Sequence, residues 1–165
     1  MSVTGGYFWP LVASGLVIGL VAGVIAFRRE HSIRILLVAA GLAIAAAAAW
    51  HWPLGAADRF AAAVDGSARR ALDYYEMTKV SGHLHRNPLS RTLTLAGPAD
   101  DFQHSELVRL LSELPGVRKA SWSPDESGLP LLVEGLLASL VGFLAGLLLA
   151  YLVELHRRHN AQWNW

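Results

Sequence analysis

Three long runs of apolar residues constrain this chain more than any other feature of its sequence. Residues 1–27 and 35–50 contain no charged side chain, and residues 130–153 contain only Glu134. A helix that crosses about 30 Å of hydrocarbon needs roughly 20 apolar residues. The sequence therefore predicts three transmembrane helices, over residues 7–27, 33–52 and 129–153.

The composition excludes several other classes of protein. The chain is 53% apolar and only 16% charged, whereas soluble domains average about 25% charged residues. A net charge of +1 argues against a nucleic-acid partner. The chain contains no cysteine, so a disulfide scaffold is excluded and the redox compartment is not indicated. No ten-residue alternation suggests a membrane barrel, which leaves helices as the spanning structures.

Basic residues in the short flanking segments predict the orientation of the spans. Arg28, Arg29 and Arg34 lie between the first two spans, and Arg157 and Arg158 follow the third. Lys and Arg in short loops favour the cytoplasmic side. We therefore expect a multi-pass protein of the bacterial inner membrane, with its N-terminus in the periplasm and its C-terminus in the cytoplasm.

Residues 28–50 also have the pattern of a signal peptide, with a basic start, an apolar middle and small residues suited to cleavage. An uncharged apolar span precedes this segment, so we expect it to remain in the membrane. The aromatic residues agree with spanning, because they fall at the depth of the interfacial belts. These residues are Trp9, Trp50, Trp52 and Tyr151.

This pattern divides the chain into three parts. Residues 1–53 form two transmembrane helices with a basic cytoplasmic loop, and residues 129–165 form the third helix with a short cytoplasmic tail. Residues 54–128 form a periplasmic domain between them. The predicted fold class is a membrane α-helical protein of three transmembrane helices with a small α+β extramembrane domain.

The pattern within residues 54–128 predicts the order helix, strand, strand, helix, strand. A helical stripe runs over residues 59–75, with Phe60, Val64, Ala68, Ala71, Leu72 and Tyr75 on one face. Asn87-Pro88 marks the turn of a hairpin. Asp100 can cap a second helix with Gln103 three residues on, and its buried stripe is Leu107, Leu110, Leu111 and Leu114. A last strand covers residues 117–122, which completes a two-layer α+β domain.

Residues 58–122 resemble a BON domain. The resemblance rests on the strand end Leu93-Thr94-Leu95-Ala96-Gly97, the amphipathic helix after it, and the run Leu114-Pro115-Gly116-Val117 before a final strand. It implies an envelope module that contacts lipid, cell wall or protein and performs no chemistry. Pro98, Ala120 and the polar hairpin depart from the family pattern, which leaves the position of a ligand surface undefined.

Small residues recur every four positions in two of the spans. Gly15, Gly19 and Gly23 share one face of the first span, and Ala138, Gly142 and Gly146 share one face of the third. Such faces let helix backbones approach closely in lipid. They either pack the three helices against one another or dock against a different membrane protein. The second interpretation is favoured slightly, because three helices offer few partners for two such faces.

The histidines form no predicted metal or cofactor site. His83 and His85 would share a strand face, but two imidazoles do not complete a zinc site. His51, His156 and His159 fall at the membrane interfaces, where a haem or chlorophyll ligand is one interpretation. The interfacial aromatic and polar belt is the favoured one. We therefore expect no metal and no cofactor.

No pattern of catalytic residues is present in the sequence. Ser81, Ser90 and Ser105 lie outside any G-x-S-x-G motif, and no glycine-rich phosphate loop occurs. No ionisable residue lies near a bilayer midplane, as a transporter or proton relay requires. The sequence therefore predicts neither an enzyme nor a transporter.

The sequence favours a non-catalytic accessory or assembly subunit of a larger inner-membrane complex, with an energy-converting complex as one candidate. Its partners would be the lipid bilayer and other integral membrane proteins, with no nucleic acid. Trp163 and Trp165 near the end of the tail suit docking into a partner. The alternative is a membrane-tethered module whose BON-like domain binds envelope lipid or peptidoglycan.

Overall fold

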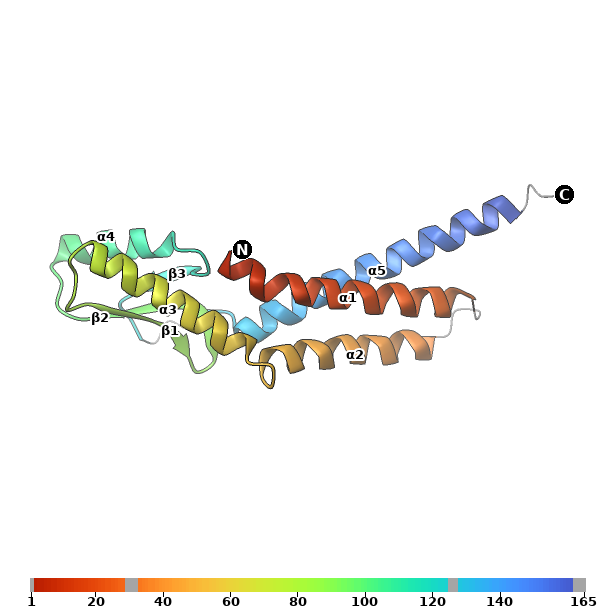
Figure 1. The fold of residues 1–165 in the computed structure, drawn as a ribbon, viewed down its shortest axis with the longest axis horizontal. Coiled ribbons are helices and arrows are strands. Elements are labelled where there is room, and N and C mark those ends of the chain that lie inside the picture. The colour runs from red at the N-terminus through yellow and green to blue at the C-terminus, as the bar shows by residue number, and fades with distance from the viewer. Residues whose placement is uncertain (1, 29–32, 125–127, 162–165) are drawn as a thin grey trace. The chain divides into compact units, whose positions relative to one another are not determined.

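A computed structural model describes residues 2–28, 33–124 and 128–161 of the chain. These residues form five helices and three strands, which are labelled in Figure 1. The elements in chain order are α1 (Val3–Arg28), α2 (Ile33–His51), α3 (Ala56–Tyr74), β1 (Ser81–Arg86), β2 (Leu89–Ala96), α4 (Asp101–Ser112), β3 (Lys119–Ser121) and α5 (Leu131–Ala161).

The three predicted apolar helices are confirmed. Helices α1, α2 and α5 are each long and apolar enough to cross a membrane. Helix α5 extends beyond the predicted end of its apolar run at Val153. The Glu154 carboxylate accepts hydrogen bonds from Arg157 and Arg158 at 2.8 to 2.9 Å. Ion pairs at these helical spacings stabilise the last turns of α5. The apolar pattern of the sequence alone assigns these turns to a tail outside the helix.

The chain divides into two compact units. The first comprises residues Met1–Tyr7 and Gly55–Glu134, and the second comprises Phe8–Leu54 and Gly135–Trp165. The first unit contains the sheet with α3 and α4, and the second contains most of the three apolar helices. Each unit is described below by itself.

The sheet of the first unit has the strand order β1-β2-β3. Strands β1 and β2 form the predicted antiparallel hairpin, with Leu84 opposite Leu93. Strand β3 runs parallel to β2, with Ala120 beside Leu93. Helix α3 packs against β1 and α4 packs against β3 (Figure 1). The element order therefore agrees with the order expected from the sequence.

The helical stripe of α3 supplies much of the domain core. Phe60, Val64, Ala68 and Leu72 are at most 3% exposed. The sequence pattern places Tyr75 on this stripe as well, but Tyr75 is 46% exposed. The expectation is wrong there because α3 ends at Tyr74, so the next residue leaves the helical face.

The second helix of the domain begins as its sequence predicts. The Asp100 side chain accepts a hydrogen bond from the Gln103 backbone at 2.7 Å, and the Gln103 side chain accepts one from the Asp100 backbone at 3.0 Å. This capping box satisfies two donors at the start of α4. Leu107 and Leu111 are buried, whereas Leu110 and Leu114 are half-buried at the margin of the core.

Strand β3 is shorter than the predicted strand over residues 117–122. The Val117 backbone N–H donates to the Leu114 carbonyl within the preceding turn, so Val117 does not pair in the sheet. At the other end, the Trp122 ring stacks on His104 with centroids 4.1 Å apart, and its Nε1 donates to the His104 carbonyl oxygen. These contacts confine the strand to Lys119–Ser121.

Candidate functional site

The glycine face of α1 packs directly against α5 in the second unit. A Cβ atom at Gly15 would overlap the carbonyl oxygen of Ser139, and one at Gly19 would overlap that of Phe143. A Cβ atom at Gly23 would lie 2.6 Å from the Cβ atom of Ala150. At Gly15 and Gly19 only hydrogen fits, because the two helix backbones are in contact, and at Gly23 the close neighbour is the Ala150 side chain.

The small-residue face of α5 makes the reciprocal contact. A Cβ atom at Gly142 would overlap the carbonyl oxygen of Val12, and one at Gly146 would overlap that of Leu16. Ala138 is half-buried, and the neighbouring Ser139 occupies the contact with α1. The two faces therefore pack against each other within one chain. The interpretation that the sequence favoured slightly, docking of these faces against a different membrane protein, is wrong for these glycines, because the facing helix already fills the contact.

Helix α2 joins this helix pair through small side chains. Ala39 and Ala43 of α2 form a buried cluster with Ala22 of α1 and Phe143 of α5. Gly41, also on α2, lies on an exposed face, where a Cβ atom would meet no neighbouring atom within 4 Å among the described residues. Close helix packing therefore requires glycine on the contact faces of α1 and α5, whereas it does not require glycine at position 41.

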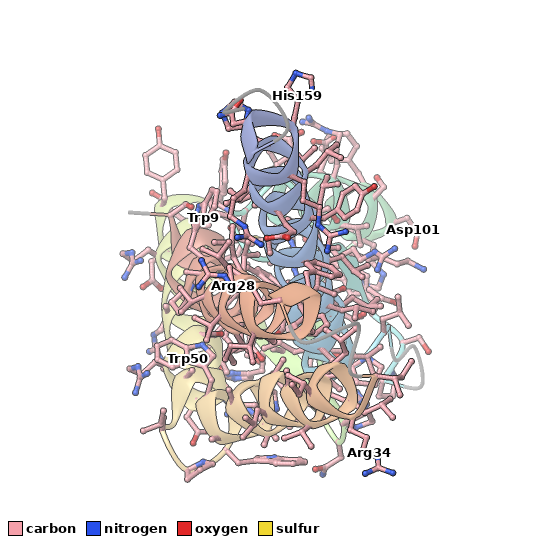
Figure 2. The ribbon with its side chains drawn as sticks, turned by 90° about the vertical axis from the view of Figure 1, so that its right-hand side faces the viewer. Trp9, Arg28, Arg34, Trp50, Asp101 and His159 are labelled. Atoms are coloured by element: carbon pink, nitrogen blue, oxygen red, sulfur yellow. The ribbon has the colours of Figure 1, made fainter. Side chains whose placement is uncertain are left out.

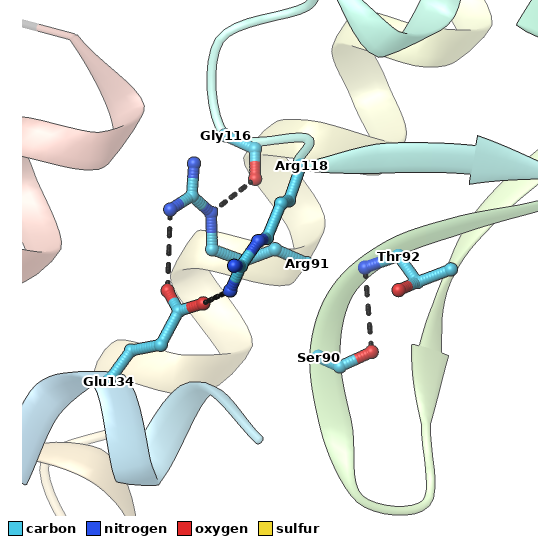
Figure 3. Close-up of polar contacts among 6 residues, drawn as sticks. All are labelled: Ser90, Arg91, Thr92, Gly116, Arg118 and Glu134. Carbon is cyan, nitrogen blue, oxygen red and sulfur yellow. Dashed lines mark hydrogen bonds and ion pairs between the residues drawn. The ribbon is translucent and has the colours of Figure 1, made fainter. Parts of the chain in front are cut away.

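An ion-pair cluster of Arg91, Arg118 and Glu134 ties the domain to the first turn of α5 (Figure 3). The Arg91 guanidinium donates to one Glu134 carboxylate oxygen at 3.3 Å, and Arg118 donates to the other at 3.3 Å. Arg91 also donates through Nε to the Gly116 carbonyl oxygen at 2.9 Å. We call these three charged residues the junction cluster.

The junction cluster matters for stability because two of its three side chains are largely shielded from water. The Glu134 side chain is 13% exposed and that of Arg91 is 22% exposed, whereas Arg118 is 59% exposed. A carboxylate shielded from water needs its partners, since removing one leaves an uncompensated charge. The sequence indicates only that Glu134 could reach interfacial water. The sequence feature that could have indicated a role for Glu134 is its position as a lone acid in the first turn of a long apolar helix.

The backbone before α5 supports the same connection. Pro130 forms an antiparallel bridge with Ser90 at the start of β2. Ser90 is fully buried, and its hydroxyl accepts a hydrogen bond from the Thr92 backbone N–H at 3.4 Å (Figure 3). The segment that leads into α5 is therefore attached to the sheet by backbone pairing as well as by the junction cluster.

The start of α1 also belongs to the domain core. Tyr7 is 2% exposed, and its ring lies 5.6 Å from that of Phe60 in a tilted arrangement. Such aromatic pairs add about 0.5 to 1.5 kcal/mol beyond the area that they bury. The domain thus packs against the first residues of one apolar helix and the first turn of another.

The two histidines of β1 each contact one neighbouring polar group. The Nδ1 atom of His83 is 3.7 Å from an Asp65 carboxylate oxygen, which also accepts from Arg86 at 2.7 Å. His85 contacts the Asn87 carbonyl oxygen at 3.0 Å. Within residues 2–28, 33–124 and 128–161, no three His, Cys, Asp or Glu side chains gather closely enough to hold a metal ion.

The interfacial residues differ in their surroundings. His51 is 6% exposed and meets the Trp52 ring edge-on, whereas His156 hydrogen-bonds Asn160 at 3.0 Å. Trp9 and Trp52 are about two-thirds exposed, as residues of an interfacial belt would be. Trp163 and Trp165, the predicted docking residues, lie outside the described residues.

The sequence matches no protein-family model, no curated protein and no solved structure. The resemblance to a BON domain therefore stays a prediction that rests on the quoted motifs. A proposal for the function of this chain therefore rests on its own sequence and structure.

Proposed function

We propose that this chain is a non-catalytic structural or assembly subunit of a larger membrane complex. Its apolar helices hold an extramembrane domain at the membrane surface, and the domain docks against partner subunits. The observation that carries the proposal is the junction cluster, because Arg91 of β2 and Arg118, which directly precedes β3, bind Glu134 in the first turn of α5. This connection anchors the domain directly to the start of a membrane helix.

The sequence supports one orientation for this arrangement. Arg28 and Arg34 flank the link between α1 and α2, which places that link in the cytoplasm by the positive-inside rule. Three crossings then place the tail on the same side and the domain on the other. In a bacterial inner membrane, the domain and the N-terminus would lie in the periplasm.

Exposed aromatic side chains support docking through the domain. Tyr74 is 81% exposed and Phe102 is 74% exposed, although both belong to the domain and not to the spans. The Tyr74 ring meets that of Tyr75 edge-on, with centroids 5.2 Å apart. Aromatic residues dominate the binding energy of protein interfaces. We therefore assign the end of α3, at Tyr74 and Tyr75, to a partner surface.

A second candidate function is envelope binding by the BON-like domain. A hollow of about 270 Å³ lies along α3 and β1 and is lined in part by Asp65, Arg69, Asp73 and His83. Its charged lining favours a polar ligand over an apolar one. If this function is correct, the full chain in detergent will sediment with peptidoglycan sacculi, and Arg69→Ala will weaken that binding.

Co-purification tests the subunit proposal. The tagged chain, expressed at its native level and extracted in mild detergent, should elute with other integral membrane proteins in fixed ratio. Replacing Tyr74 and Tyr75 together by serine should lower their recovery about tenfold or more, because interface hot spots contribute at least about 2 kcal/mol. Recovery would be measured by quantitative mass spectrometry.

The matched control for this experiment is Arg70→Ala, an exposed change one turn earlier on α3. It should leave the recovery of partners unchanged. A chain that elutes alone in the unaltered form contradicts the subunit proposal. Equal recovery from the double tyrosine variant would show that the partner surface lies elsewhere.

A further inference from the structure

A long apolar groove runs between α1 and α2. Its volume is about 510 Å³, which lies within the range of about 300 to 1,000 Å³ for small-molecule sites. Its floor includes Ala22 and Ala39, which belong to the buried cluster between the three helices. Its remaining lining residues are Val17, Ile18, Val21, Ile25, Arg34, Ile35, Val38 and Leu42.

The groove is about as long as one leaflet of a bilayer is thick. The lining residues of α1 run from Val17 to Ile25, and those of α2 run from Arg34 to Leu42. Each stretch covers about 12 Å at 1.5 Å per residue. One leaflet contributes about 15 Å of the roughly 30 Å hydrocarbon core. A partner helix that spans the membrane would need a groove through both leaflets, whereas a single acyl chain needs only one.

One end of the groove carries a positive charge. Arg34 lines the groove at the start of α2, and Arg28 lies in the last turn of α1; both are labelled in Figure 2. Among the described side chains, neither arginine forms an ion pair with an acid. The other nine lining residues are all apolar. A guanidinium binds phosphate oxygens in a bidentate geometry.

We propose that this groove binds one acyl chain of an anionic phospholipid, with the lipid phosphate on Arg34. The lipid comes from the leaflet on the side of the link between α1 and α2. Apolar walls accommodate the chain, and the arginine selects a headgroup whose net charge is negative. This site is separate from the partner surface on the domain, and it goes beyond the subunit function proposed above.

Lipid retention by the full chain tests this inference. The purified chain would be exchanged into detergent with equal amounts of phosphatidylglycerol and phosphatidylcholine, and bound lipid would be counted by native mass spectrometry. We expect one retained phosphatidylglycerol per chain. Arg34→Gln should lower this preference about fivefold, which is the effect of one basic residue at an anionic membrane surface.

Two further variants separate the site from general effects of charge and folding. Arg158→Gln removes a basic residue that already pairs with Glu154, so it should retain the lipid. Val38→Trp enlarges an exposed wall residue and should exclude the acyl chain without disturbing the buried floor. Equal retention of both lipids by the unaltered chain would overturn the inference. The inference would also be overturned if the Val38→Trp variant lost a bound protein partner while it retained the same amount of lipid.

Discussion

Replacing Gly19 by leucine is expected to force α1 away from α5 and to destabilise the helix bundle. A Cβ atom at this position would overlap the backbone of Phe143, and backbone cannot move aside as a flexible side chain can. Overpacking of a close contact costs about 1 to 3 kcal/mol. In a membrane, this loss removes the close packing that holds the helices together. Thermal unfolding of the purified chain in mild detergent would measure the effect.

Gly41→Leu is the matched control for this change. Gly41 also lies in an apolar helix, but no neighbouring atom of the described residues lies within 4 Å of the position that its Cβ would occupy. Leucine has a higher helix propensity than glycine, so the control should be neutral or slightly stabilising. If both variants unfold at the same temperature, the contact between the glycine faces of α1 and α5 does not hold the bundle together.

Replacing Glu134 by alanine is expected to destabilise the domain by about 3 kcal/mol. Removal of one partner from a shielded ion pair costs about 3 to 5 kcal/mol when the remaining charge stays buried. Arg91 is 22% exposed and keeps its bond to the Gly116 carbonyl oxygen, so we expect the lower end of that range. Resistance of the domain to limited proteolysis and its thermal unfolding would both report the loss.

Glu106→Ala provides the comparison for the junction cluster. Glu106 pairs with Arg109 on the surface of α4 at 2.8 Å, with side chains 36% and 59% exposed. Hydrogen bonds from Arg109 lower the pKa of the Glu106 carboxyl below its ordinary value. Exposed pairs of this kind contribute about 0 to 1 kcal/mol. Equal effects of the two alanine substitutions would contradict a special role for Glu134.

The local features of this fold can be predicted from the sequence because they depend on neighbouring residues. An apolar run of sufficient length predicts a span, and Asp100 followed by Gln103 predicts a helix start. The predictions are wrong where contacts override the local pattern. The pattern places Trp122 within a strand, but its stacking on His104 takes it out of the sheet.

The candidate sites are less predictable because their parts come from distant segments. Arg91 lies 43 residues before Glu134 in the chain, and no spacing rule connects them. The interval of Gly15, Gly19 and Gly23 predicts a close helix contact, but it does not identify the partner. Only the structure pairs that face with Gly142 and Gly146 of α5.

The central claim is that the chain crosses the membrane three times, with its domain on the side opposite to the basic link and the tail. Because the chain has no cysteine, single cysteines can report each side without interference. Thr78→Cys places one on an exposed position of the domain, and Asn160→Cys places one at the end of α5. In intact spheroplasts, a membrane-impermeant maleimide should label Thr78→Cys at once and Asn160→Cys only after the membrane is permeabilised. Labelling of Asn160→Cys with protection of Thr78→Cys, or equal labelling of both, would contradict the claim.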